Sequence, residues 1–328
     1  MTEQSRVVLG IDISKATLDV ELVRPDQGNQ QASYANTQTG FKKLEKWLRK
    51  RKAGQVHVCL EATGLYGDEV ALFLHEAGHT VSVVNPARIK AYAASQLQRN
   101  KTDRLDAALI ADFCLTQKPT AWEPPEPAIL ELRALARHLL DLKDMRQQER
   151  NRLEAGVTSD TVRQTLEAHI AFIQHQIDQL EQHIRDHIDQ QPGLKRQRDL
   201  LASIPGIGHL TAALLLAEIG DWRRFAHAGQ VVAFAGLNPR QRRSGSSVRG
   251  QTRLSKTGNA ILRRILYCPA LSARRYNPRI APWCDQLAGR GKTKMQIIGA
   301  AMRKLLVLAY GVLKSGRPFD PTYHPVSS

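Results

Sequence analysis

The sequence predicts an α/β N-terminal part, a pair of long helices, and a mostly helical C-terminal part. Over residues 5–120 short apolar runs alternate with helical stretches, which is typical of a mixed sheet covered by helices. Isoleucine and leucine then recur at spacings of three and four, and after residue 195 apolar helices are separated by glycine turns. We therefore expect three parts, 1–120, 121–194 and 195–328.

The N-terminal elements follow in order along the chain. "VVLGIDIS" and "LDVELV" predict two adjacent strands, and "VHVCLEATG" predicts a strand that runs into a glycine turn. "GDEVALFLHEAG" predicts a helix ending at Gly78, and "HTVSVVNP" a strand stopped by Pro86. Helical patterning resumes at Arg88 and again from Asp103 to Phe113. A mixed sheet with helices accounts for this order.

The middle of the chain is helical. "KPTAWEPPEPAIL" carries four prolines between 119 and 127 and predicts a connector. The apolar seam that follows consists of Ile170, Ile173, Ile177, Leu180, Ile184 and Ile188. This spacing is typical of a coiled coil. A coil between chains and a helix packed within its own domain both fit it.

Charge and cysteine content limit the class of protein. The net charge is +16 and the isoelectric point about 10.0, which favours a polyanionic partner. Eight basic residues and no acidic one lie between residues 240 and 264, a cluster typical of a nucleic-acid contact. The four cysteines are far apart, without a C-x-x-C pair, and neither a membrane span nor an export signal is evident. We expect a cytoplasmic protein with no membrane partner.

Four carboxylates form the candidate metal site. Asp12 lies in an apolar strand, where a charge is costly without a partner or a metal, and Glu61 ends a second strand. Asp103 and Asp106 share one helical face. Divalent cations such as Mg²⁺ would relieve the repulsion within such a cluster and serve phosphodiester cleavage. The residues also fit separate roles, as a strand end, a surface glutamate and N-terminal helix charges, and the pattern alone leaves both interpretations open.

Two further stretches indicate contacts with nucleic acid. In "SIPGIGHLTAALLLAEIG", Gly206 and Gly208 predict the hairpin of a helix-hairpin-helix element, whose second helix offers free N–H groups to a phosphate; a turn without a ligand also fits. "RQRRSGSSVRG" carries Ser244, Ser246 and Ser247 among glycines and arginines. From spacing alone, a phosphate grip is favoured over a serine nucleophile. The basic residues expected to contact nucleic acid here are Arg240, Arg242, Arg243, Arg249, Arg253 and Lys256.

These motifs together resemble a known family. "GIDISKATLDV", "NKTDRLDAALIADFC", "SIPGIGHLTAALLLAEIG" and "FAGLNPRQRRSGSSVRG" are similar, in this order, to the DEDD transposases of bacterial insertion sequences of the IS-one-ten type, relatives of the Piv DNA invertase. The resemblance runs over nearly the whole chain. It is weakest in the middle helices.

The resemblance implies more than the residues alone. It implies an N-terminal domain of the RNase H type, similar to the RuvC junction resolvase, with Asp12, Glu61, Asp103 and Asp106 holding Mg²⁺. It implies that Ser244 is the nucleophile for strand cleavage in the C-terminal transposase domain, with a covalent serine–DNA intermediate. It also implies target and donor DNA as substrates, an element-encoded bridge RNA as guide, and a dimer or tetramer in bacterial cytoplasm near the nucleoid.

Three other hypotheses compete with this one. A Mg²⁺-dependent junction nuclease would cut DNA with water and would form no covalent serine intermediate. An actin-like sugar kinase is suggested by "GIDIS", but no second glycine-rich phosphate loop is evident. A DNA-binding protein without catalysis would explain the basic cluster but would leave Asp12 and Glu61 without a role.

Overall fold

The computed structural model describes residues 7–24, 28–62, 65–96, 103–240, 243–244, 248–249 and 253–322. The chain folds as two compact units, residues 1–124 and 125–328. The predicted central segment, 121–194, does not form a unit by itself, because its long helices belong to the second unit.

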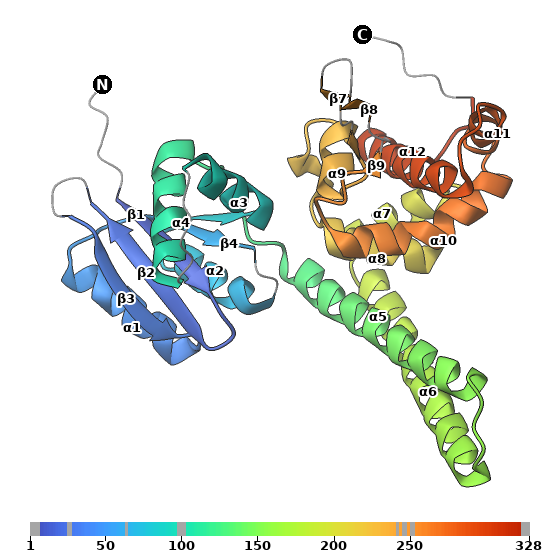
Figure 1. Ribbon diagram of the computed structural model, residues 1–328, viewed down its shortest axis with the longest axis horizontal. Coiled ribbons are helices and arrows are strands. Elements are labelled where there is room, and N and C mark those ends of the chain that lie inside the picture. The colour runs from blue at the N-terminus through green and yellow to red at the C-terminus, as the bar shows by residue number, and fades with distance from the viewer. Residues whose placement is uncertain are drawn as a thin grey trace. The chain divides into compact units, whose positions relative to one another are not determined.

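Unit 1 is built on a five-stranded mixed sheet whose strands are β1 (Val8–Ile13), β2 (Thr17–Val23), β3 (Gln30–Ala35), β4 (His57–Glu61) and β5 (Thr80–Val84). Their order is β3-β2-β1-β4-β5 (Figure 1). The first three strands form an antiparallel meander, whereas β4 and β5 run parallel to β1. The β1–β2 turn is tight because Ser14 Oγ accepts the N–H of Thr17 at 2.9 Å.

Helices cover both faces of this sheet. They are α1 (Gln38–Lys50), α2 (Leu65–Glu76), α3 (Pro86–Ser95) and α4 (Asp103–Gln117). On one face Leu9 and Ile11 pack in a buried cluster with Phe41 of α1 and Val70 of α2. On the other face Val8 and its neighbours pack under α3 and α4, which Figure 1 shows crossing the sheet. Alternate residues of β1 therefore face different helices.

The sequence analysis does not predict strand β3 or helix α1. β3 lies at the sheet edge and alternates between half-buried and exposed residues, so its sequence, QQASYA, has no apolar run. Helix α1 is strongly amphipathic, with Phe41, Leu44 and Leu48 buried among lysines and arginines. Its apolar residues recur at helical spacing, a signal that could have been found.

A hydrogen-bonded network around Glu45 joins α1 to the sheet core. His79 is 8% exposed, and its Nε2 lies 2.9 Å from Glu45 Oε2, while Arg49 Nε donates to the other carboxylate oxygen at 2.6 Å. Burial alone raises the pKa of Glu45, but the hydrogen bonds from His79 and Arg49 outweigh it and hold the pKa below its usual value. The carboxylate of Glu45 therefore contributes to stability in its charged form.

Unit 2 opens with a helical hairpin, α5 (Pro127–Glu154) and α6 (Asp160–Asp189). Four residues of the predicted seam, Ile173, Ile177, Ile184 and Ile188, are buried. They pack in the core of unit 2, and α6 lies along α5 of the same chain (Figure 1). The seam is therefore covered by the preceding helix of its own chain, the second of the two arrangements that its spacing allows.

The rest of unit 2 is mostly helical, as the sequence predicts. Its elements are α7 (Pro192–Ala202), α8 (His209–Ile219), the 3₁₀ turn η1 (Trp222–Arg224), α9 (Ala228–Phe234), α10 (Ala260–Tyr276), α11 (Ala281–Gly289) and α12 (Lys294–Ser315), with two short ladders between α9 and α10. Among the described helices, α12 has the length and composition to cross a membrane, but it forms part of the buried core of unit 2.

A buried carboxylate ties three of these helices together. Glu218 of α8 is 3% exposed and accepts from Arg137 Nε of α5 at 2.8 Å. It also accepts from Asn259 Nδ2 at 2.8 Å, and Asn259 is the N-cap of α10. Because a buried charge is costly without partners, this network fixes how α5, α8 and α10 meet.

Candidate functional site

The candidate active site is at the carboxyl ends of β1 and β4. These strands are parallel, and their register runs from Val8 opposite His57 to Ile11 opposite Leu60, so that Asp12 and Glu61 come next. Both side chains are half-buried. Asp12 is on the same face as Gly10, because successive residues of a strand alternate between faces. The two carboxylates named from the sequence thus follow neighbouring parallel strands in the backbone.

Helix α4 crosses that face directly over Gly10. A Cβ built on Gly10 would lie 2.3 Å from Ala107 O and 2.4 Å from Ala111 N, so only glycine permits this approach. Nearer the end of α4, Cys114 Sγ donates to His57 O at 3.8 Å, at the amino end of β4. The helix therefore runs antiparallel to β1 and β4, and its first turn lies toward their carboxyl ends.

The distances along helix and strand agree with a convergence of carboxylates. From Ala107 back to Asp103 is four residues, about 6 Å of helix at ~1.5 Å per residue. From Gly10 to Asp12 is two residues, about 6.6 Å of strand at ~3.3 Å per residue. Asp106, which directly precedes Ala107, is half-buried. The start of α4 thus reaches the level of Asp12.

The structure describes the side chains of three of the four predicted carboxylates, Asp12, Glu61 and Asp106. Asp103 begins α4, but its side chain lies outside the described part of the structure. Among the residues that are described, no three acidic, histidine or cysteine side chains are close enough together to hold a metal ion. The donors of the set are carboxylate oxygens alone, the ligand type that Mg²⁺ prefers.

A further carboxylate on this face was missed from the sequence. Asp19 of β2 is directly opposite Asp12, and directly opposed residues of antiparallel strands share a face. It lines a polar cavity of about 160 Å³ together with Gln31 and Ser33 of β3 and Ala107 of α4. The signal was available, because the short β1–β2 turn fixes which residues face each other.

The Cys59 thiol under α4 has low reactivity because of its surroundings. Cys59 of β4 and Cys114 of α4 are both buried. A hydrogen bond with Cys114 and burial raise the pKa of the Cys59 thiol, so it stays protonated at neutral pH. These cysteines fill the space between helix and sheet.

The predicted helix-hairpin-helix glycines have different surroundings. Gly206 has φ +108°, and a Cβ there would lie 2.7 Å from Ala273 Cβ of α10. Asn277 Nδ2 holds the same turn by donating to Pro205 O at 3.0 Å. Gly206 therefore serves packing against α10. Gly208, the N-cap of α8, has open space around it and no side chain capping the helix.

The serine loop is held by two short ladders. β6 (Pro239–Arg240) pairs with β9 (Arg253–Leu254), and β7 (Arg243–Ser244) pairs with β8 (Val248–Arg249). Ser244 has Val248 as its backbone partner, which places it in the inner ladder of the hairpin. The other residues named for this loop are Arg242, Ser246 and Ser247, which lie outside the described residues, and Lys256, which is exposed.

Two arginines of the basic cluster serve the fold. Arg263 Nη1 donates to the carbonyl oxygens of Ala235 and Gly258 at 3.0 and 3.1 Å and so closes the base of the loop. Arg264 makes two hydrogen bonds of 2.5 Å to Asp144 of α5. Counting charges in the sequence therefore overestimates the number of cations that are available to a ligand.

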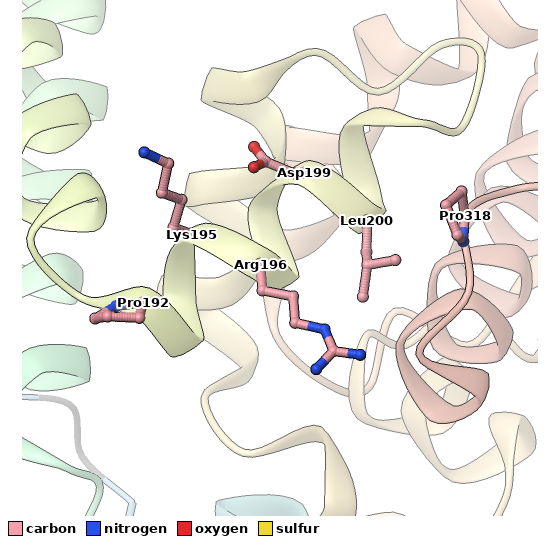
Figure 2. Close-up of a pocket in the computed structure, with 6 residues that line it drawn as sticks. All are labelled: Pro192, Lys195, Arg196, Asp199, Leu200 and Pro318. Carbon is pink, nitrogen blue, oxygen red and sulfur yellow. The ribbon is translucent and has the colours of Figure 1, made fainter.

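A larger hollow, of about 430 Å³, is lined by Pro192, Lys195, Arg196, Asp199, Leu200 and Pro318 (Figure 2). Figure 2 shows Arg196 and Leu200 extending from one side of α7 and Lys195 and Asp199 from the other. Asp199 is already paired with Arg198 at 2.8 Å. The six lining residues therefore do not converge on one point as a catalytic set would.

Comparison with known proteins finds two family models along the chain, and the first extends past the boundary between the two units. A family model described as "Transposase" matches residues 9–159, and one described as "Transposase IS116/IS110/IS902 family" matches residues 198–283. The pilin gene-inverting protein of Moraxella bovis is 36% identical over 330 residues, covering 98% of this chain and 99% of that protein. The "Insertion element IS110 uncharacterized 43.6 kDa protein" of Streptomyces coelicolor is 28% identical over 163 residues, 50% of this chain and 39% of that protein.

The chain also matches a solved structure, "T. thermophilus RuvC in complex with Holliday junction substrate". The match covers 32% of this chain and 90% of the RuvC chain at 16% sequence identity. Its TM-score is 0.23, which is too low to establish a common fold. The pilin gene-inverting relative, by contrast, matches from end to end at 36% identity. On that relative and the two family models, the chain belongs to the IS116/IS110/IS902 family of transposases and is a DNA recombinase.

Proposed function

We propose that this transposase cuts and rejoins DNA strands with two groups of residues. Asp12, Glu61, Asp103 and Asp106 hold Mg²⁺, and Ser244 is the nucleophile. The observation that supports the carboxylate half is the antiparallel crossing of α4 over Gly10, which directs the first turn of α4 to the strand ends. The serine half rests on the family resemblance of "RQRRSGSSVRG".

The carboxylates have one common task, which is to bind and orient. When bound there, Mg²⁺ neutralises their charge and that of a DNA phosphate, which makes the phosphorus easier to attack. Asp12 and Glu61 come from neighbouring strands, so they approach from the sheet, while Asp106 approaches from the helix. Ligands from β1, β4 and α4 would approach an ion from three directions, which suits Mg²⁺ because it prefers octahedral surroundings.

Ser244 carries the covalent step. Its Oγ forms a bond to phosphorus while one P–O bond to a deoxyribose oxygen breaks. The hydroxyl proton of the serine leaves to solvent or a nearby base, and the departing deoxyribose oxygen takes up a proton. The number of phosphate ester bonds is unchanged, so attack by a second strand's hydroxyl reverses the step and rejoins DNA without a nucleotide cofactor.

Other residues grip the nucleic acid. The arginines of the serine loop, Arg240, Arg242, Arg243, Arg249 and Arg253, together with Lys256, contact phosphates of target and donor DNA. The uncapped start of α8 at Gly208 offers N–H groups to a further phosphate. By resemblance to the family, an element-encoded bridge RNA supplies sequence recognition by base pairing.

The central experiment tests the covalent serine. Protein purified together with any RNA that it binds is incubated with labelled donor DNA and Mg²⁺, quenched in detergent, and analysed for protein–DNA adducts. We expect an adduct with wild type and with Ser246→Ala and Ser247→Ala, and none with Ser244→Ala. Cleavage without an adduct would instead favour a structure-specific nuclease that uses water, the alternative from the sequence. Full Mg²⁺-dependent cleavage by Asp12→Asn would refute the metal assignment.

The active form is proposed to be a homo-oligomer in which the carboxylates of one subunit work beside the serine of another. Asp12→Asn and Ser244→Ala proteins are each expected to be inactive. Mixed together, they restore one complete site if it is shared between subunits, and none if each chain completes its own. Recombination by the mixture therefore checks the shared site, and its absence would refute it.

RNA guidance has a separate test. The protein is purified from cells carrying its flanking DNA, and any bound RNA is sequenced. We expect one defined RNA with segments complementary to target and donor. A preparation that is free of nucleic acid and still recombines the same sites would refute guidance by RNA.

A further inference from the structure

The hydrogen-bonded ladder between β1 and β4 ends just before the two candidate carboxylates. Its last pair among the described residues is Ile11 and Leu60. Strand β1 stays paired with β2 as far as Ile13, and β4 stays paired with β5 through Glu61. Backbone pairing therefore holds Asp12 to β2 and Glu61 to β5, and the separation of the two carboxylates depends on contacts beyond the β1–β4 ladder.

Asn36 joins the two chain segments beyond that point. It directly follows β3, and its Nδ2 donates to Ser14 O in the β1–β2 turn and to Tyr66 O in the first turn of α2, each at 3.0 Å. Ser14 is two residues after Asp12, and Tyr66 is five residues after Glu61. One side chain thus connects the segment that follows Asp12 to the segment that follows Glu61.

The backbone around Asn36 is tightly held. The N–H of Asn36 donates to Ala16 O at 2.9 Å, within the same β1–β2 turn. Thr37, the next residue, is the N-cap of α1. A Cβ built on Gly40 would lie 1.8 Å from Ala35 O, so only glycine lets α1 start this close to the end of β3. Asn36 therefore lies between a strand end and a helix start, where its amide reaches both partners.

The connection requires a side chain with two donors. Both partners of Asn36 are backbone carbonyl oxygens, which accept hydrogen bonds, and the NH₂ group of asparagine carries two N–H donors. Leucine has a similar shape and no donor. Asn36→Leu would therefore remove both hydrogen bonds with little change in volume or charge.

We propose that Asn36 is a positioning residue that sets the spacing between Asp12 and Glu61. It acts through the segments that carry Ser14 and Tyr66. The inference rests on the proposed function, because this spacing matters to the reaction only if both carboxylates hold the same Mg²⁺. That ion demands ligands at about 2.0–2.1 Å in near-octahedral geometry, so small displacements of either carboxylate weaken its binding.

The first measurement is hydrogen exchange of the full-length protein by mass spectrometry, in EDTA and without DNA. We expect Asn36→Leu to speed exchange about fivefold in peptides that contain Ser14 or Tyr66, the factor for one lost hydrogen bond. The matched control is Asn29→Leu. Asn29 precedes the other end of β3, and its Nδ2 donates to Glu21 Oε1 at 2.8 Å, so its loss should leave exchange in those peptides unchanged.

The second measurement is the Mg²⁺ concentration that gives half-maximal DNA cleavage, well below the melting midpoint of each variant. Asn36→Leu should raise it about tenfold, the size of effect typical of residues that orient metal ligands. Asn29→Leu should leave it at the wild-type value, because a residue that only stabilises the fold does not change the Mg²⁺ requirement of folded protein. Asp12→Asn, which should abolish cleavage, tests the carboxylate assignment in the same assay.

Two outcomes would overturn the proposal. One is an Asn36→Leu protein whose hydrogen exchange or Mg²⁺ requirement matches wild type; the other is an equal rise of the Mg²⁺ requirement in Asn29→Leu. Full cleavage by Asp12→Asn would instead refute the metal assignment. Hydrogen exchange in EDTA would still show whether Asn36 joins the two segments, so the two hypotheses fail separately.

Discussion

Replacing Gly10 with alanine tests whether the approach of α4 to β1 forms the active site. The new Cβ would lie 2.3 Å from Ala107 O and 2.4 Å from Ala111 N, both backbone atoms that cannot rotate away. A carbon normally keeps about 3.5 Å from such atoms. Helix α4 must therefore move off the sheet by about 1 Å, and its first turn, with Asp103 and Asp106, moves with it.

The cost follows from this displacement. Extra methyl groups in a packed core typically cost about 1–3 kcal/mol, and contact with two backbone atoms favours the upper end. For a unit of this size we expect a loss of about 3 kcal/mol, or about 10 °C in melting temperature. Displacement of catalytic groups by about 1 Å can reduce a rate by about 100-fold, so cleavage should fall even at temperatures where Gly10→Ala is folded.

The assay has two parts. Calorimetry follows the unfolding of unit 1, and Mg²⁺-dependent cleavage is measured at least 15 °C below the observed midpoint. The matched control is Gly311→Ala on α12, where a Cβ meets nothing within 4 Å and helix propensity predicts a gain of about 1 kcal/mol. A Gly10→Ala protein that melts like wild type and cleaves at full rate would refute the close approach.

Three further predictions concern stability and packing. The pKa of the Glu45 carboxyl is lowered in the folded state, so its contribution to stability is present above its pKa in the unfolded chain and is lost as the pH falls through its pKa in the folded state. Glu45→Gln should therefore lower the free energy of unfolding at pH 7, and the difference from wild type should shrink below pH 4.5 in urea titrations. Glu218→Ala should cost about 3 kcal/mol in urea unfolding because it leaves a paired arginine without its carboxylate, whereas Arg264→Gln, at an exposed pair, should cost under about 1 kcal/mol. Gly206→Ala should lower the melting temperature by several degrees, but Gly208→Ala should not, because only Gly206 has positive φ and a helix against it; equal effects would contradict this assignment.

Much of the site's framework could be predicted from the sequence because its signals are local. Asp12 between two isoleucines indicates a strand, and Glu61 before a glycine turn indicates the end of a strand. The i, i+3 pair Asp103 and Asp106 indicates the start of a helix. Their order in a mixed sheet then favours a common edge. In the structure the strands of Asp12 and Glu61 are parallel neighbours, an arrangement that these local signals leave open.

Other features depend on contacts that no local pattern encodes. The partner of Arg264, Asp144, is 120 residues earlier in the chain, and Gly206 is pressed against Ala273 rather than left open to a phosphate. Strand β3 pairs through its backbone at a sheet edge, so its side chains need no apolar run. Each of these depends on where distant elements meet.

Small residues recur along α4 because the helix lies so close to the sheet. Ala107, Ala111 and Cys114 are spaced by four and three residues, which puts them on one helical face, and all three are buried toward the sheet. Gly10 supplies the matching gap on β1. Because the middle of α4 is packed this closely against the sheet, the start of the helix has little freedom to tilt. The position of Asp103 and Asp106 is therefore controlled by small residues that have no catalytic role themselves. A larger side chain at Ala111, such as in Ala111→Leu, should therefore impair cleavage as Gly10→Ala does, although neither residue carries a carboxylate.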